Sequence, residues 1–174
     1  RTSGHPSIGE SLLSKALRCH EKVLNDGLGP KDEINHALLI INLAWEQLNN
    51  ISCTKVNVHG DLNPRNIFLK DGKILLIDWA ETTLEDPFYD LAYFSMKLDY
   101  SPEEEHQLLS SYLMRKSTPE ELRRFHLHKK RHLAFWSLTN LYLADVELRK
   151  HPYTKVNKNT PLQSCSYYQK MNAD

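Results

Sequence analysis

The sequence predicts an α+β fold that is mostly helical, with one small β-hairpin near the middle of the chain. Apolar residues recur at helical spacing on both sides of residues 56–80. Inside that segment, two short apolar runs flank Asp71-Gly72, a dipeptide favoured in tight hairpin turns. A chain of 174 residues is long enough to bury a core as one domain of ordinary size. A small hairpin among helices excludes a doubly wound sheet.

Two helices are expected before residue 50. Ser7 and Glu10 have the spacing of a capping box, and apolar residues then follow at helical intervals. The glycines and the proline within residues 27–30 end this first helix. A second helix is expected from about Asp32 to Asn49, because apolar residues again gather on one face.

The pattern then changes to that of strands. Residues 56–58 alternate apolar and polar side chains, as in a short half-buried strand. Residues 67–69 and 74–77 are the two expected arms of the hairpin. The chain thus predicts a loop, a hairpin and Asp78 in direct succession.

Helices are expected again after residue 86. Ser101 and Thr118 are each followed by Pro-Glu-Glu, which supplies an N-cap, a proline at the first helical position and an acidic first turn. These signals predict helices from about Pro102 to Arg115 and from about Pro119 to Leu148. Residues 151–174 are polar and weakly patterned, and we expect them to form a loosely packed tail.

The composition bounds the class of protein. The formal net charge is zero, so nothing indicates a nucleic-acid partner or an anionic membrane surface. No apolar run approaches the roughly 18 residues that a membrane-spanning helix needs. The three cysteines are far apart and form no disulfide or metal pattern, which favours a cytoplasmic location. The chain begins at Arg1 without methionine, and we interpret it as a fragment or a processed product.

Four polar residues around the hairpin suggest phosphoryl transfer. His59, Asp61 and Asn66 form an H-x-D-x-x-x-x-N array, and Asp78 ends the second arm of the hairpin. Phosphoryl transfer needs an acceptor for the nucleophile's proton, oxygen ligands for magnesium and fixed geometry. Asp61 is the candidate for the first role, with Asn66 and Asp78 for the second. Each residue has a plain alternative as a turn former or a cap, but the joint spacing favours the site.

The neighbouring residues carry weaker signals. His59 is expected to hold the loop backbone rather than to act as a base. Asp90, at the start of a helix, is expected to accept backbone N–H groups of the loop, to cap its own helix, or both. Arg65 is a candidate phosphate or substrate contact, with a solvent-facing side chain as the alternative. Glu81 attracts a cationic substrate in one interpretation and is merely solvated in the other.

These motifs resemble a known family. The residues that carry the resemblance are His59-Gly60-Asp61-Leu62-Asn63-Pro64-Arg65-Asn66, Ile77-Asp78-Trp79-Ala80, Asp86-Pro87 and Asp90-Leu91-Ala92. They look like those of the aminoglycoside phosphotransferase and choline kinase superfamily. The resemblance implies the C-terminal lobe of a protein-kinase-like fold and phosphorylation of a small-molecule hydroxyl by Mg²⁺ and ATP. It implies that Asp61 is the catalytic aspartate, that Asn66 and Asp78 are magnesium ligands, and that Asp90 braces the loop.

Two features favour a small-molecule substrate over a protein. Gly60 precedes Asp61, where regulated protein kinases carry an arginine. Only eleven residues separate Asp78 from Asp90, too few for a peptide-binding activation segment. The chain also departs from the family's pattern. Asn63 stands where these enzymes often have histidine and protein kinases have lysine, and Arg65 stands where glycine is frequent.

No phosphate-clamping lobe is visible in the sequence. The residues before Val56 contain no glycine-rich loop and no strand-rich region, whereas a kinase needs such a loop and a paired lysine to hold ATP. We therefore expect residues 1–150 to be the C-terminal lobe alone, with the catalytic loop and hairpin at 56–80. The missing N-terminal lobe of the same protein would be its partner, and the isolated chain is expected to be inactive.

The acceptor pocket is expected among the helices that follow Asp90. Their aromatic residues, Trp136 and Tyr142 among them, suit an amine or quaternary ammonium through cation–π contacts, and nearby acidic residues add charge attraction. Choline or ethanolamine is slightly favoured over an aminoglycoside, although aromatic residues at helical spacing are more often core. A pseudokinase or scaffold that only binds is the alternative function.

A metal site is a third hypothesis. It would use His126, His128 and His132, of which the last two lie four residues apart on one helix. The intervening residues 129–131 are basic and no further ligand has a matching spacing, so a solvated helix face is favoured.

Overall fold

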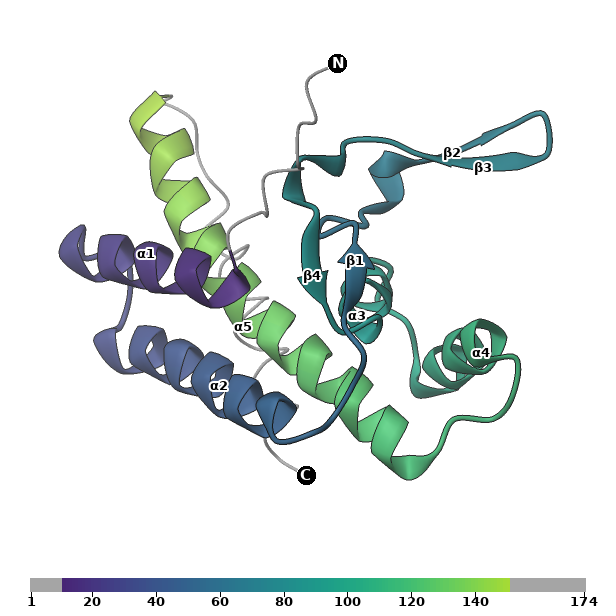
Figure 1. The fold of residues 1–174 in the computed structure, drawn as a ribbon. Helices are drawn as coiled ribbons and strands as arrows, with labels where there is room; N and C mark the ends of the chain where they lie inside the picture. The colour runs from purple at the N-terminus through teal and green to yellow at the C-terminus, as the bar shows by residue number, and fades with distance from the viewer. Residues whose placement is uncertain (1–10, 151–174) are drawn as a thin grey trace, which may run out of the picture. The chain divides into compact units, whose positions relative to one another are not determined.

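A computed structural model of the chain describes residues 11–150, with side chains to residue 146. It divides into two compact units, which are traced in Figure 1. Of the described residues, the first contains residues 11 and 50–129, and the second contains residues 12–49 and 130–150. The expected capping box of Ser7 and Glu10 and the expected tail after residue 150 lie outside the described residues.

The second unit contains the two helices predicted before residue 50. These are α1 (Leu12–Asn25) and α2 (Lys31–Asn49), joined by the C-terminal part of α5 (Pro119–Lys150). Helix α1 ends at Asn25, just before the predicted stop at Gly27, whose φ of 64° belongs to the left-handed region that favours glycine. The amide of Leu28 donates back to the carbonyl of Val23 and closes the last turn. The apolar spacing buries one face of each helix, with Ala16, Val23, Ile34 and Ile41 almost fully covered.

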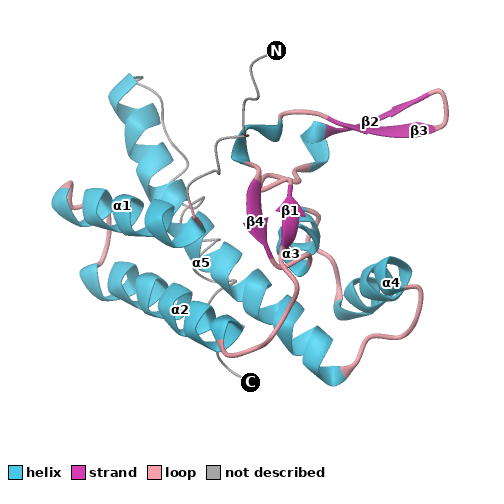
Figure 2. Ribbon diagram, in the orientation of Figure 1, coloured by secondary structure: helices cyan, strands magenta, loops and turns pink. Residues whose placement is uncertain are grey.

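The first unit contains the strands. The predicted hairpin is confirmed, because β2 (Ile67–Lys70) pairs antiparallel with β3 (Lys73–Leu76). Asp71 and Gly72 both have positive φ, as the favoured two-residue hairpin turn requires. The hairpin extends away from the rest of its unit (Figures 1 and 2). The predicted strand at residues 56–58 is also confirmed as β1 (Val56–Val58).

The sequence did not reveal the partner of β1. It is β4 (Thr83–Glu85), which pairs with β1 antiparallel and joins Val58 to Thr83. Three residues with one apolar side chain have no periodicity to detect, so this pairing depends on the tertiary structure. The β1–β4 ladder brings the start of the candidate loop next to the segment that follows Asp78.

The helices of the first unit follow the predicted caps. They are α3 (Phe88–Lys97), α4 (Pro102–Leu113) and the first turns of α5. At the start of α4, Ser101 and Glu104 form a reciprocal capping box. Phe88, Ala92, Leu109 and Phe125 form a buried cluster that packs these three helices together. This cluster makes α3 a rigid support for the residues that it presents. Within the described part of the chain, no helix is both long and apolar enough to cross a membrane.

The expectation of a solvated basic face on α5 was wrong for His128, Lys129, Arg131 and His132, which are all buried. The first two each lie against a carboxylate. His128 Nε2 lies 3.4 Å from Asp86, and Lys129 forms an ion pair with Glu105. Arg124 adds a 2.6 Å ion pair to Asp86. The helical pattern of α5 did not reveal this, because the neutralising carboxylates come from distant parts of the sequence.

Glu105 makes the stability of this fold pH-dependent. Its burial raises the pKa, but hydrogen bonds from His126, Lys129 and Ser95 outweigh burial and lower the pKa to about 2. Because the folded-state pKa lies below the ordinary value of 4.5, the stabilisation is present above pH 4.5 and is lost as pH falls towards 2. We expect Glu105→Gln to lower the free energy of unfolding at pH 7 by about 3 kcal/mol, since Lys129 loses its buried partner. The same substitution should flatten the acid limb, as measured by urea unfolding at several pH values.

Glu103→Gln is the matched control, because Glu103 is exposed in the same helical turn. It should leave the free energy of unfolding near that of the parent. Parallel acid limbs for the parent and Glu105→Gln would contradict the assignment to Glu105.

Candidate active site

The candidate loop starts where β1 ends. Val58 is buried, and the chain then runs through His59 and Gly60 to a 3₁₀ turn at Pro64–Asn66. The Asn63 side chain caps this turn by accepting a 3.1 Å hydrogen bond from the backbone N–H of Arg65. Pro64 fits the first position of the turn, where its fixed φ is favourable. The loop is thus shaped by its own sequence, and Asn63 has a local structural role.

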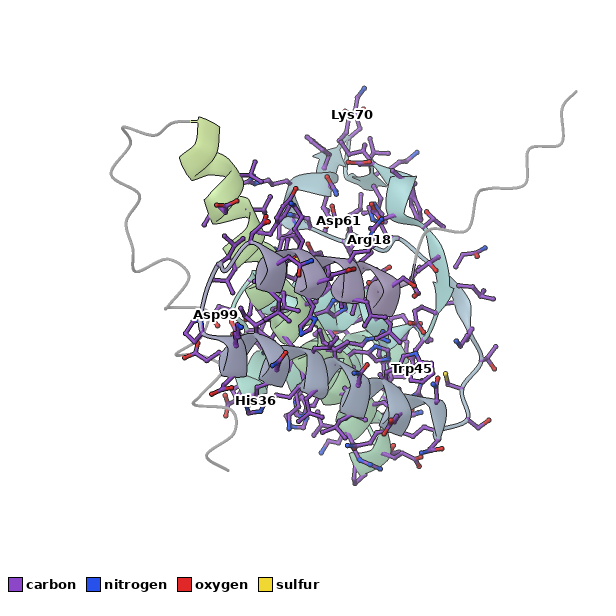
Figure 3. The ribbon with its side chains drawn as sticks, turned by 90° about the vertical axis from the view of Figure 1, so that its left-hand side faces the viewer. Arg18, His36, Trp45, Asp61, Lys70 and Asp99 are labelled. Atoms are coloured by element: carbon purple, nitrogen blue, oxygen red, sulfur yellow. The ribbon has the colours of Figure 1, made fainter. Side chains whose placement is uncertain are left out.

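Asp61 lies at the centre of a hydrogen-bond network. The Tyr93 hydroxyl donates to Oδ1 at 2.7 Å, and Asn66 Nδ2 donates to Oδ2 at 3.2 Å. The same Asn66 nitrogen also donates to the backbone carbonyl of Asp61 at 3.0 Å. The side-chain nitrogen of Asn66 is therefore used in hydrogen bonds to Asp61. Its side-chain carbonyl oxygen is the atom that could bind a cation. Figure 3 labels Asp61 and, at the upper edge of the view, the Lys70 side chain, which extends outward.

His59 connects the loop to the end of the hairpin. Its ring is buried, Nε2 donates to the carbonyl of Ile77 at 2.8 Å, and Nδ1 accepts from the backbone N–H of Asp61 at 3.3 Å. Trp79 packs against the ring with centroids 4.7 Å apart. Both ring nitrogens are therefore engaged, which favours the structural interpretation of His59 over a role as base.

Asp78 directly follows Ile77, whose backbone is held by hydrogen bonds to the loop. The N–H of Ile77 donates to the carbonyl of Asn66 at 3.0 Å, so Ile77 is bonded to both His59 and Asn66. Asp78 itself is exposed and has a φ of 62°, in the left-handed region. That conformation costs about 1–3 kcal/mol for a residue with a Cβ, and it persists here because its neighbour is fixed. The hairpin thus returns Asp78 to the loop with its carboxylate accessible.

Asp90 holds the backbone of the loop. From the first turn of α3, its carboxylate accepts the N–H of His59 at 2.6 Å and that of Gly60 at 3.0 Å. Burial raises the pKa of Asp90 above its ordinary value, and these two bonds oppose that rise. Gly60 has a φ of 83°, and a Cβ there would lie 2.0 Å from the carbonyl oxygen of Glu81. The loop and the segment after Asp78 therefore approach too closely for any residue except glycine.

The remaining predicted residues lie outside this network. The Arg65 side chain is exposed, and Glu81 is half-buried with its carbonyl against Gly60. Trp136 and Tyr142 belong to the second unit, where Trp136 packs edge-on against Phe135 and Tyr142 meets the Lys22 ammonium 5.6 Å from its centroid. A contact between either ring and an acceptor stays a prediction.

Sequence reasoning missed the contact between Tyr93 and Asp61. Tyr93 is one of the aromatic residues that follow Asp90, and it was not singled out among them. The available signal was spacing, because Tyr93 lies three residues after Asp90 and so shares its face of α3. A residue on that face has to point towards the loop that Asp90 holds.

The metal hypothesis for the histidines of α5 is not supported. Among the described side chains, no group of three or more His, Cys, Asp or Glu residues is arranged to hold a metal ion. His126 is instead hydrogen-bonded to Glu105, and His128 Nε2 lies 3.4 Å from Asp86. Asn66 and Asp78 are a different kind of candidate, because Mg²⁺ binds through one or two protein oxygens together with substrate phosphates and water.

Comparison with known proteins assigns the part of the chain that contains the candidate loop to one family. Residues 11–126, more than half of the chain, match the model of the phosphotransferase enzyme family. The curated protein LicA of Haemophilus influenzae is 37% identical over 54 residues, which are 31% of this chain and 20% of LicA.

Solved structures extend the likeness to nearly the whole chain. A choline/ethanolamine kinase family protein from Mesorhizobium loti superposes with a TM-score of 0.71 at 18% identity, over 96% of this chain and 54% of that one. Choline kinase LicA from Streptococcus pneumoniae superposes with a TM-score of 0.70 at 17% identity, over 99% and 57%. These superpositions establish a shared fold, and they confirm the predicted kinase-like, mostly helical α+β class. The chain spans about half the length of these structures.

Proposed function

The chain belongs to the phosphotransferase enzyme family, and from this premise we propose that it carries the catalytic loop of an ATP-dependent kinase acting on a small-molecule hydroxyl. The network around Asp61 is the observation that supports this most. It joins Asp61, Asn66 and Asp90, and it ends one residue from Asp78. The proposal therefore rests on one connected arrangement rather than on separate motifs.

Asp61 is proposed to orient the acceptor hydroxyl and to take its proton. An ionised carboxylate has about four lone-pair sites, and Tyr93 and Asn66 each use one of them. Each oxygen thus retains capacity to accept a hydrogen bond from the substrate. Because the carboxylate is held from both sides, it does not have to be ordered when the substrate binds, which lowers the entropic part of the barrier.

The Asn66 and Asp78 side chains fit a magnesium ion. The first offers a neutral carbonyl oxygen and the second an exposed carboxylate, and both are hard donors of the kind that Mg²⁺ takes. When bound with ATP, the ion would neutralise charge on the phosphate oxygens. The chain's own contribution is to hold Asn66 by its amide nitrogen and Asp78 by the backbone of Ile77.

We attribute the clamping of the ATP phosphates to residues outside this chain. The hairpin supports this, because it exposes apolar residues of the kind that a partner surface covers. Leu69 is 76% exposed and Ile74 is 70% exposed. A nucleotide-binding lobe of the same protein is the proposed occupant of that surface. The proposal agrees with the chain spanning about half the length of the solved relatives.

The proposed acceptor is an amino alcohol such as choline or ethanolamine, with an aminoglycoside as the alternative. The proteins with the same fold include a choline kinase and a choline/ethanolamine kinase family protein, which is the support for this order. No observation favours a binding-only role, since Asp61, Asn66 and Asp78 are all present.

The test is a coupled ADP-release assay on the complete protein and on residues 1–174, with Mg-ATP and choline, ethanolamine or kanamycin. We expect Mg²⁺-dependent turnover of one acceptor by the complete protein and little turnover by residues 1–174. Nucleotide binding by the complete protein without turnover of any small alcohol would favour the binding-only alternative. Full activity of residues 1–174 would refute the assignment of the clamp to another segment.

A further inference from the structure

Tyr93 occupies an unusual position for a core aromatic residue. It is 2% exposed and lies on α3, yet its hydroxyl reaches the Asp61 carboxylate at 2.7 Å. Burial, followed by the hydrogen bond to Asp61, raises the pKa of Tyr93 well above its ordinary value. The phenol therefore keeps its proton at every working pH and remains a donor to Asp61.

Helix α3 holds the loop at two points. Asp90 accepts the N–H groups of His59 and Gly60, and Tyr93, one turn later, donates to the side chain of Asp61. Backbone and carboxylate are thus attached to the same helix, which the cluster around Phe88 and Ala92 keeps in place. A hydrogen bond from the loop alone, through Asn66, would leave the carboxylate free to turn about that single contact.

Lys97 lies one further turn along α3 and fixes the Tyr93 ring. Its ammonium is 5.2 Å from the ring centroid, on one face of the aromatic system, which is a favourable cation–π distance. Burial lowers the pKa of Lys97, whereas the charge of Asp61 opposes this. The side chain is half-buried, and its positive charge attracts the same carboxylate that Tyr93 contacts. Tyr93 and Lys97 therefore share one face of α3, and the Asp61 carboxylate of the loop is hydrogen-bonded by the first and attracted by the charge of the second.

We propose that Tyr93 is a positioning residue for phosphoryl transfer, which orients the carboxylate of Asp61 towards the acceptor hydroxyl. This inference rests on the proposed function of Asp61. Tyr93 acts through Asp61, so its loss should slow the chemical step without weakening substrate binding.

The test is Tyr93→Phe in the complete protein, assayed with Mg-ATP and the acceptor that the protein turns over. The substitution removes one hydroxyl and keeps the ring and its contact with Lys97. A hydrogen bond to a charged group is worth enough for kcat to fall about tenfold or more. We expect KM for both substrates to change less than twofold. Tyr100→Phe is the matched control, because it deletes a hydroxyl from a ring that packs on Phe94 of the same helix. It should retain the parent kcat.

Two further measurements keep the outcomes distinct. Thermal unfolding of each variant gives the folded fraction at the assay temperature, and Asp61→Asn shows whether the reaction depends on Asp61 at all. Loss of activity in Asp61→Asn together with a parent-like kcat in Tyr93→Phe would overturn the positioning role and leave the proposed function standing. A kcat loss in Tyr93→Phe that disappears once the folded fraction is taken into account would also overturn it. Parent-like activity in Asp61→Asn would instead refute the proposed function itself.

Discussion

Replacement of Asp61 by asparagine is expected to lower kcat of the complete protein by about 100- to 10,000-fold, the range for loss of a positioned general base. Asparagine keeps the size of the side chain and can still meet Asn66 or Tyr93, but it cannot take a proton from the acceptor. Affinity for Mg-ATP should be nearly unchanged, because Asp61 is not among the proposed metal ligands. Steady-state kinetics and calorimetric titration with Mg-ATP measure the two effects separately.

Asp71→Asn is the control for this substitution. Asp71 is exposed in the hairpin turn and has a φ of 51°, a conformation that asparagine also adopts readily. Asp71→Asn makes the same chemical change at a residue outside the loop, so kcat should stay near that of the parent. Equal losses in both variants would indicate a general effect of charge and contradict the role given to Asp61.

Replacement of Gly60 by alanine is expected to destabilise the protein by about 3 kcal/mol or more and to abolish turnover. The added Cβ would lie 2.0 Å from the carbonyl oxygen of Glu81, and backbone atoms cannot move aside as a flexible side chain can. The φ of 83° adds strain for any residue with a Cβ. Either the loop or the segment after Asp78 has to shift, which separates Asp61 from its partners. Urea unfolding and kcat measure the two consequences.

Gly72→Ala separates the steric clash from the backbone strain. Gly72 has a φ of 72°, but a Cβ there would meet nothing within 4 Å. Gly72→Ala should lower the free energy of unfolding by only about 1–2 kcal/mol, which is the strain of the left-handed conformation alone. If both alanine variants were destabilised equally, the close approach between Gly60 and Glu81 would not be a determinant of the loop.

The elements that could be predicted from the sequence are those whose signals are local. The hairpin follows from two apolar runs around Asp71-Gly72, and α4 begins directly after Ser101 because that residue and Glu104 form a capping box. Turns and caps depend on residues a few positions apart, so the chain near them is sufficient to specify them. Strand β4 had no such signal, since only its pairing with β1 makes it a strand.

The candidate site shows the same division. Asp61 and Asn66 are five residues apart on one loop, so their proximity could be expected from spacing. The contacts that orient them could not, because Tyr93 is 32 residues from Asp61 along the chain. Sequence reasoning likewise treated Lys129 and His128 as solvated, whereas Glu105 and Asp86 bury them as paired charges.

The sequence by itself determined which residue types stand in the loop, where the hairpin turns and where the helices of the first unit begin. The tertiary structure decided what those side chains meet. Asp90 and Tyr93 reach the loop because α3 packs on the cluster of Phe88, Ala92, Leu109 and Phe125, which brings its first two turns against residues 59–61. Local signals act over a few residues, whereas a carboxylate is oriented by whichever donor the packed core brings within about 3 Å of it.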